Sequence, residues 1–395
     1  MSLESPFHIA HIVDLRVVGG IERILVEFVS ATPYVKHSLI LFDKNIHPSH
    51  ISALKNLSQI VGIYSAKHLF GIRLPKAMRV GRRAKLIAQT GANVVLNWSQ
   101  VIDMRCISIP IVFYEHGSSW ENYSINQLKN CYQRVHHGIA VSIAAKRMLQ
   151  LNHHFSAHCD IVENTAFKPP KVSTKERIFP QTKIVIGAAG RLVERKNFTV
   201  LISAIAKLRT RWDVRLQIAG VGPEQYQLQK QIEDLELQDV VVLLGYVNDM
   251  DSFYQRIDLF VNPSLWEAMP MVAIESFSAG IPIVGTTTDG LPEKVRHGIN
   301  GLCIEPTWTA EQFERNMLQK AYFANEVSYH PALDTLVTQK SISVEDLVLT
   351  LDRLFSEPKL YQKMSASALD TAAEIRTLEQ WVDVLLTSIK SACHA

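Results

Sequence analysis

The sequence has few cysteines, which are not clustered, and it lacks long apolar runs. Its 395 residues include five cysteines, which are scattered and show no metal-knuckle spacing. This pattern argues against a disulfide framework, and a reducing compartment is expected. An apolar run such as residues 107–114 is far too short to span a bilayer. Residues 1–9 carry Glu4 and Pro6 and no apolar core of signal-peptide length. We therefore expect a cytoplasmic location.

Acidic residues are missing between Asp43 and Asp103, although the net charge of the whole chain is only +3. A basic segment with interleaved apolar side chains binds anionic lipid headgroups or phosphorylated ligands. We expect this one to contact an anionic membrane, peripherally on the inner face of the plasma membrane, or a lipid-linked or phosphorylated acceptor. The alternative is a solvated helix face. The residues concerned are Arg73, Lys76, Arg79, Arg82, Arg83 and Lys85.

Several sequence fingerprints are also absent. The chain has neither a P-loop nor a Ser-His-Asp nucleophile elbow, and we expect no nucleic-acid partner. Gly19 and Gly20 lie between an apolar strand and a helical pattern that starts at Ile21, but they do not complete Gly-x-Gly-x-x-Gly. A nicotinamide cofactor is therefore not indicated. A glycine pair at this place does allow a phosphate or sugar to approach the backbone.

Short apolar runs alternate with helical patterns in both halves of the chain. Runs that are apolar on consecutive positions are typical of parallel strands covered on both faces. The pattern stops at the proline-containing segment Phe167–Pro180 and then restarts. We predict an α/β protein with two Rossmann-like, doubly wound domains facing each other across a cleft. The expected parts are residues 1–172, residues 173–375 and a C-terminal helix in 376–395 that packs back on the N-terminal domain.

The expected strands are well defined, whereas residues 308–343 give no clear pattern. In the first half they are 8–13, 38–42, 59–64, 93–97, 109–114, 138–142 and 160–163. In the second half they are 184–189, 214–219, 240–244, 259–263 and 281–285. Between the first two of these, Asn197 is expected to cap a helix.

Two glutamates follow the expected strand at 259–263. Pro270 is suited to a helix start, and Gly280 to its end. Glu267 is therefore expected in a loop at the carboxyl end of a parallel strand, and Glu275 in the helix. Ligands bind at that edge of such sheets, the helix start attracts anions, and carboxylates accept hydrogen bonds from sugar hydroxyls. In the alternative interpretation, Glu267 caps the helix and Glu275 points to solvent.

Cations follow the first strand of the second half. Gly190 ends this strand, and Arg191 and Lys196 come before the next helix. Together they could neutralise a diphosphate, with Arg195 as an alternative cation. An ordinary basic loop is the other interpretation.

Two groups of residues superficially suggest metal sites. Asp249-Met250-Asp251 precedes a helix that either aspartate could cap. The second group has no recognised ligand spacing and is interpreted as surface. It consists of His153, His154, His158, Cys159 and Asp160.

The second half resembles glycosyltransferase family 4, whose members are retaining enzymes of the GT-B fold. The resemblance covers residues 183–306 and is weaker in the first half, where Gly19-Gly20 and His116-Gly117 carry it. One departure is the loop Glu-Ala-Met-Pro after residue 266, where many relatives have glycine and an aromatic residue. The matching motifs are Gly190-Arg191-Leu192 with Lys196, Ile218-Ala219-Gly220-x-Gly222-Pro223, Leu244-Gly245-Tyr246-Val247, Glu267 with Glu275, and Gly290-Leu291-Pro292-Glu293.

The resemblance implies a nucleotide-diphosphate sugar as donor, with UDP favoured, a glycan acceptor, and no metal or other cofactor. Transfer of a hexose or N-acetylhexosamine into bacterial surface polysaccharide or lipopolysaccharide is implied. Arg191 and Lys196 would hold the diphosphate, and Glu275 the ribose. Tyr246-Val247 would meet the base, while Gly190, Gly19 and Gly20 line the donor site and His116 approaches the sugar. The donor sugar would be held by Glu267, Ala268, Met269, Pro270, Met271 and Val272. The catalytic residues would be Arg191, Lys196, Glu267 and His116.

Three alternatives remain open at this stage. The chain could be another GT-B enzyme, either a phosphorylase or a sugar-nucleotide epimerase. A phosphorylase of the glycogen type would carry pyridoxal phosphate on a lysine. The chain could also be a non-catalytic binding or scaffold member of the family.

Overall fold

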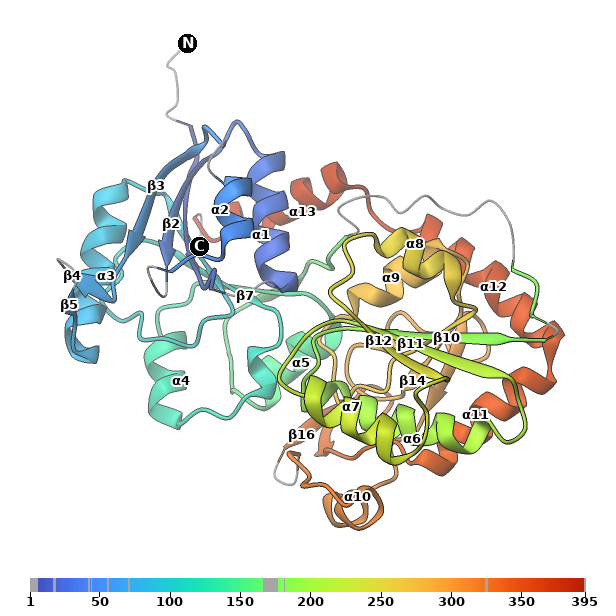
Figure 1. Ribbon diagram of the computed structural model, residues 1–395. Coiled ribbons are helices and arrows are strands. Elements are labelled where there is room, and N and C mark those ends of the chain that lie inside the picture. The colour runs from blue at the N-terminus through green and yellow to red at the C-terminus, as the bar shows by residue number, and fades with distance from the viewer. Residues whose placement is uncertain are drawn as a thin grey trace. The chain divides into compact units, whose positions relative to one another are not determined.

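The computed structural model divides the chain into two compact units (Figure 1). Unit 1 comprises Met1–Phe167 and Arg376–Ala395, and unit 2 comprises Lys168–Ile375. The expected linker, Phe167–Pro180, lies outside the described residues up to position 176. Each unit is described by itself. The structure describes residues 6–16, 19–41, 43, 45–54, 57–69, 72–165, 177–180, 182–323 and 326–393.

Unit 1 contains a parallel sheet with the strand order β3-β2-β1-β6-β7-β8-β9. Every residue of β1, β6 and β7 is buried, as the consecutive apolar runs predicted for strands covered on both faces. The strands are β1 (His8–Val13), β2 (Lys36–Leu41), β3 (Ile60–Ser65), β6 (Val94–Trp98), β7 (Ile111–Glu115), β8 (His137–Ala140) and β9 (Cys159–Ile161). A two-stranded ladder joins β4 (His68–Leu69) and β5 (Ile72–Arg73).

The last helix of the chain, α13 (Leu378–Ser391), belongs to unit 1. Its Trp381 is fully buried and meets Phe28 edge-to-face, with ring centroids 5.9 Å apart. Ser388 donates a hydrogen bond of 2.6 Å to Asp160 in β9. The other helices of unit 1 are α1 (Gly20–Ala31), α2 (Pro48–Leu54), α3 (Lys76–Thr90), α4 (Ile125–Tyr132) and α5 (Ile143–Leu151).

Unit 2 contains a second parallel sheet, with the order β12-β11-β10-β13-β14-β15. The strands are β10 (Ile184–Ala189), β11 (Val214–Ala219), β12 (Val241–Gly245), β13 (Leu259–Val261), β14 (Ile283–Thr286) and β15 (Gly301–Ile304). A hairpin of β16 (Val327–His330) and β17 (Thr335–Thr338) is separate. The helices are α6 (Phe198–Leu208), α7 (Gln225–Asp234), α8 (Met250–Arg256), α9 (Met271–Ser278), α10 (Ala310–Met317), α11 (Val344–Ser356) and α12 (Pro358–Ala373).

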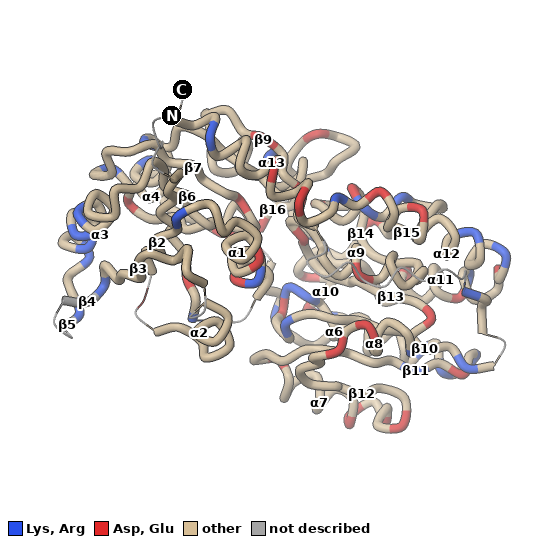
Figure 2. The backbone as a smooth tube through the Cα atoms, turned by 90° about the horizontal axis from the view of Figure 1, so that it is seen from above, with Lys and Arg blue, Asp and Glu red and all other residues tan. Residues whose placement is uncertain are grey.

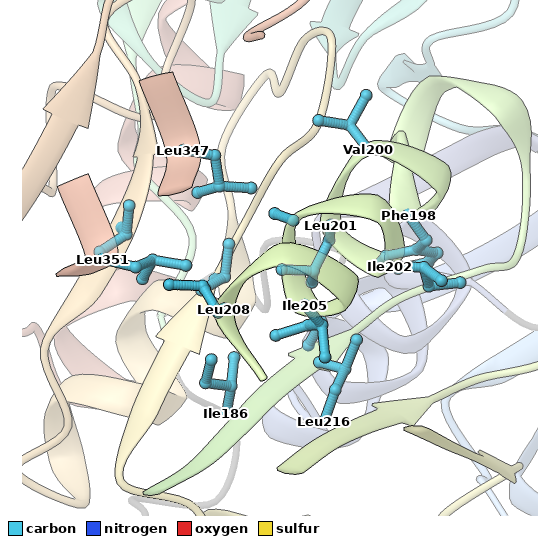
Figure 3. Close-up of a cluster of buried hydrophobic side chains, with 14 of the residues drawn as sticks. Ile186, Phe198, Val200, Leu201, Ile202, Ile205, Leu208, Leu216, Leu347 and Leu351 are labelled. Atoms are coloured by element: carbon cyan, nitrogen blue, oxygen red, sulfur yellow. The ribbon is translucent and has the colours of Figure 1, made fainter. Parts of the chain in front are cut away.

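The core of unit 2 surrounds α6, which is apolar on most of its circumference. Its Leu201 and Ile205 pack with Ile186 of β10 and Leu216 of β11, and α11 contributes Leu347 (Figure 3). All five side chains are fully buried. A fully buried Leu or Ile contributes about 1.5–3 kcal/mol relative to an exposed one, so this contact stabilises the packing of α6 on the sheet.

Both sheets reverse their strand order beside the first strand of the unit. In unit 2 the chain runs outward from β10 through β11 to β12 and returns on the other side of β10 as β13. Unit 1 does the same at β1 and β6. Open α/β sheets bind ligands outside the carboxyl ends of the strands at such a reversal. A ligand-binding site is therefore expected at the loops after β10 and β13.

Candidate functional site

A buried ion pair lies at the reversal point of unit 2. Lys196 ends a 3₁₀ turn after β10, and Glu267 lies in the loop after β13. The Lys196 Nζ lies 2.5 Å from the Glu267 Oε1, and the two side chains are only 13% and 10% exposed. Ser264 donates a further hydrogen bond of 2.7 Å to the same oxygen. Two residues that the sequence pattern placed in separate motifs are thus in direct contact.

The environment of Glu267 keeps its carboxylate ionised. Burial raises the pKa of Glu267, but the charges of Lys196 and Arg195 and the hydrogen bonds from Lys196 and Ser264 outweigh this effect and lower it below its usual value. The helix after it, α9, has Pro270 at its N-cap and no side-chain cap. Glu267 is therefore not the helix cap, which was the alternative interpretation, and it is poorly suited to act as a general acid.

Two glycines allow the surrounding loops to approach this closely. A Cβ on Gly220 would lie 1.8 Å from the carbonyl oxygen of Gly190, and Gly220 has φ +145°. A Cβ on Gly290 would lie 2.1 Å from the carbonyl oxygen of Ala268. Gly290 also donates its N–H to the Glu267 carbonyl, at 2.8 Å. Larger residues at these two positions would push the loops apart.

The two arginines near Lys196 differ in their surroundings. Arg191, directly after Gly190, is exposed, and within the described residues no ion pair to it is found. The Arg195 guanidinium instead stacks over Trp266, 4.4 Å from the ring centroid. Arg195 is therefore held on an aromatic face, while the Arg191 guanidinium is exposed.

The amino end of α9 lies next to the ion pair in the chain. Ala268 and Met269 are buried, whereas Met271 and Val272, the first two residues of the helix, are half-buried. The first N–H groups of a helix have no partner within the helix, and they carry the positive end of its dipole. A cation, a buried carboxylate and a helix start thus adjoin one another, an arrangement suited to a charged sugar ligand.

Glu275 lies within α9 and does not point freely into solvent. The hydroxyl of Tyr254 in α8 donates a 2.9 Å hydrogen bond to its Oε2. Burial, followed by the charge of Glu275, raises the pKa of Tyr254 well above its usual value, so the phenol remains a donor. The sequence pattern did not single out Tyr254, because its contact with Glu275 crosses from one helix to another.

The segment expected to meet a base follows β12 at the edge of the sheet. Tyr246 is 62% exposed, while Val247 is half-buried against the core. The strand order places β11 between β12 and β10. Tyr246 and Lys196 therefore follow strands that are two positions apart at the same edge of the sheet.

In unit 1, the predicted site residues lie at the carboxyl ends of β1 and β7. Gly19 is the N-cap of α1, which Gly20 begins. His116 follows β7, and its ring stacks on Trp98 with centroids 5.6 Å apart. Its Nε2 is buried and has no hydrogen-bond partner among the described residues. Burial lowers the pKa of His116 to about 3, so the ring is neutral.

The basic segment lies on β5 and α3, where Figure 2 shows Lys and Arg gathered. Arg79 donates to the Leu74 carbonyl at 2.7 Å. Arg83 donates to the Asp103 carbonyl at 2.8 Å, and burial lowers its pKa to about 10. The Nε of Arg82 is buried. The exposed cations of the segment are Arg73, Lys76 and Lys85.

The residues that suggested metal sites have structural roles. Asp249 caps α8 by accepting from the Ser252 N–H at 3.1 Å, which confirms the predicted cap. His153 is buried and lies 2.9 Å from the Tyr132 hydroxyl. The assignment to the surface was wrong for His153, which also contacts the Glu121 carbonyl, and for Cys159, because both are buried. In the described parts of the chain, no three His, Cys, Asp or Glu side chains gather as a metal site.

Residues 171–320 match the family described as "Glycosyl transferases group 1". This part of the chain is similar to the group 1 glycosyltransferases. The lipopolysaccharide core biosynthesis glycosyltransferase LpsE of Rhizobium meliloti is 36% identical over 140 residues, 35% of this chain and 40% of LpsE. The putative colanic acid biosynthesis glycosyltransferase WcaL of Escherichia coli is 31% identical over 149 residues, 35% of this chain and 36% of WcaL. The chain thus aligns with less than half of each relative.

A solved structure is similar over almost the whole chain. Anabaena HepE, in complex with UDP and glucose, superposes with a TM-score of 0.74 over 98% of this chain and 100% of HepE, at 17% identity. At that identity the similarity establishes the fold. The GT-B fold class, with two Rossmann-like doubly wound domains, is therefore confirmed, as is the family resemblance that the motifs indicated.

Proposed function

We propose that this group 1 glycosyltransferase chain transfers a hexose or N-acetylhexosamine, with retention, from a nucleotide-diphosphate sugar to a glycan acceptor. The observation that carries the proposal is the buried Lys196–Glu267 pair at the reversal point of unit 2, next to the start of α9. UDP is the favoured nucleotide, and HepE was solved with UDP and glucose. The names of LpsE and WcaL favour a role in bacterial surface polysaccharide or lipopolysaccharide synthesis.

The proposed chemistry needs no metal ion. Positive charge develops at the anomeric carbon of the sugar while negative charge grows on the departing diphosphate. Arg191, Lys196 and the amino end of α9 would stabilise the departing charge. Glu267 would accept hydrogen bonds from the sugar hydroxyls, and Glu275 from the ribose.

We expect a thermal-shift panel of UDP-, GDP- and ADP-glucose and the matching N-acetylglucosamine donors to identify one nucleotide. The matching donor should raise the melting temperature and be hydrolysed slowly to the nucleoside diphosphate. Glu275→Gln should weaken its binding about 10-fold, since a hydrogen bond to a charged group contributes about 1.5–3 kcal/mol. Glu233→Gln, an exposed glutamate at the far end of α7, should have no effect. No shift and no hydrolysis with any donor would refute the proposal.

We also propose that the exposed cations of β5 and α3 bring the protein to an anionic membrane surface or to a lipid-linked, phosphorylated acceptor. Lys76 and Lys85 are exposed on α3, and Met78 between them is 58% exposed. No helix within the described residues is long and apolar enough to cross a bilayer. The contact that we propose is peripheral, at the cytoplasmic face.

Charge reversal at α3 should weaken vesicle binding. Each lysine near an anionic surface contributes about 1 kcal/mol, so Lys76→Glu with Lys85→Glu should reduce partition onto phosphatidylglycerol vesicles by at least about 10-fold in a sedimentation assay. Lys359→Glu with Lys363→Glu on α12 makes the same change in net charge and should bind like the wild type. Equal losses in both pairs would indicate a net-charge effect. Binding of the wild type to soluble glycerol phosphate but not to vesicles would favour the acceptor over the membrane.

A further inference from the structure

Residues 308–341 form a segment that leaves the sheet of unit 2 after β15 and returns before α11. Trp308 and Ser341 close it with a two-residue antiparallel bridge, in which each N–H donates to the other's carbonyl at 2.9 Å. The segment contains α10 and the β16–β17 hairpin, drawn in orange in Figure 1. Residues 324 and 325 lie outside the described part. The sequence pattern did not assign this segment, and the chemistry proposed above does not use it.

The closing bridge of the segment contacts the loop that carries Lys196. Asn197 is buried, lies directly after Lys196 and has φ +54°. Its Nδ2 donates to the Ser341 Oγ at 2.9 Å and to the Pro263 carbonyl at 3.2 Å. The Ser341 hydroxyl in turn donates to the Ile342 carbonyl. The side chain of Asn197 therefore ties three loops together instead of capping α6 as expected.

The hairpin of the segment contacts the loop that supports Glu267. Asp289 donates its N–H to the Tyr329 carbonyl, and Tyr329 donates its N–H to the Asp289 Oδ1, both at 2.8 Å. Asp289 is fully buried with φ +59°. The next residue, Gly290, donates to the Glu267 carbonyl at 2.8 Å. The hairpin is thus connected to the backbone of Glu267 through the hydrogen bonds of two successive residues, Asp289 and Gly290.

We propose that residues 308–341 fix the positions of the Lys196 and Glu267 loops relative to each other in the donor site. This inference rests on the proposed function. Asp289 and Ser341 are the positioning residues, because each joins the segment to one of the two loops. Catalytic groups must stay within about 0.5 Å of their productive places. Without the contacts of Asp289 and Ser341, Glu267 would keep its ion pair but would orient the donor sugar less well.

The test separates nucleotide binding from turnover. Asp289→Gly removes the carboxylate that Tyr329 uses and tolerates the positive φ. It should lower kcat for hydrolysis of the donor identified by the panel about 10-fold, while binding of UDP alone, or of the nucleoside diphosphate selected by the panel, stays within threefold of the wild type. Asp289→Asn keeps an acceptor oxygen and tolerates this backbone conformation, and it should restore kcat to within threefold. Ser341→Ala should lower kcat in the same direction.

A control within the same hairpin is Ser328→Ala. Ser328 is buried, and its hydroxyl accepts a hydrogen bond of 3.1 Å from the side chain of Gln339, directly after β17. Within the described residues, no other hydrogen bond of this side chain is found. It should lower the melting temperature but leave kcat unchanged. The inference is wrong if Ser328→Ala loses as much kcat as Asp289→Gly, or if both Asp289→Gly and Ser341→Ala turn over like the wild type. A wild type that hydrolyses no donor would instead refute the proposed function itself, and the inference with it.

Discussion

Replacing Lys196 by methionine is expected to lower kcat by about 10²–10³-fold, the usual loss when one preorganised group that stabilises developing charge is removed. Methionine keeps the apolar stem and removes the ammonium, which lies 2.5 Å from the Glu267 carboxylate. Nucleoside diphosphate release from the matching donor measures the loss. Lys230→Met, on the exposed face of α7, is a matched control and should keep wild-type activity.

The same substitution should destabilise unit 2, because it leaves a buried carboxylate without its main partner. Breaking a buried ion pair by removing one partner costs about 3–5 kcal/mol. The charge of Lys196 is the largest contribution that lowers the pKa of Glu267, so that pKa should rise in the variant. The stability deficit relative to the wild type should then shrink as the pH falls from 7 to 5, when Glu267 takes up a proton.

The double variant Lys196→Met with Glu267→Gln distinguishes the two effects. It removes both charges and should regain most of the unfolding free energy while remaining inactive. Urea unfolding followed by pulse proteolysis reports on unit 2 separately from unit 1, which matters because two-unit chains seldom unfold in one step. If the double variant were as unstable as Lys196→Met, the buried pair would not be the cause of the loss.

Local sequence patterns predicted the elements of the sheets well, because each depends on residues close together in the chain. The expected strands at 184–189 and 214–219 match β10 and β11, and the C-terminal helix expected in 376–395 is α13. Pro270 and Gly280 bracket α9 as predicted. Burial on both faces favours apolar residues at most positions of a parallel strand, so such strands are visible as mostly apolar runs.

Contacts between distant parts of the chain could not be predicted in this way. Glu267 was expected to bind sugar hydroxyls, but nothing in the sequence showed that Lys196, 71 residues earlier, would pair with it. Asn197 was correctly placed at a helix start, yet its amide binds Ser341 rather than the helix. The hairpin strands are four residues long and alternate little. Their partner, Asp289, is recognisable only in three dimensions.

A chain of buried histidines in unit 1 gives the second large effect, a loss of stability in acid. The Trp98 indole N–H donates to the His11 Nδ1 at 3.0 Å, so His11 carries its proton on Nε2, which lies 2.8 Å from the His37 Nδ1. The His37 Nε2 then donates to Thr32, whose hydroxyl donates to the Phe28 carbonyl at 2.6 Å. Every nitrogen has a partner only while both rings are neutral, because a second proton on either ring would face another donor.

We expect unit 1 to lose about 3 kcal/mol between pH 7 and pH 4 from His37 alone, at about 1.4 kcal/mol per pKa unit. Burial is the main cause that lowers the pKa of His37 from 6.5 to about 4, and burial followed by the charge of His37 lowers that of His11 well below its usual value. The unfolded chain therefore takes up protons below pH 6.5 before the folded one does, so this stability is complete above pH 6.5 and is lost as the pH falls towards 4.

Pulse proteolysis in urea, read from peptides of residues 6–165, measures this loss of unfolding free energy. His11→Gln with His37→Gln offers amides of similar reach that do not titrate and should remove at least about 3 kcal/mol of this dependence, whereas His158→Gln, at an exposed histidine, should leave it unchanged. A wild-type profile that stays flat from pH 7 to 4 would show that these rings accept protons without breaking the chain of hydrogen bonds.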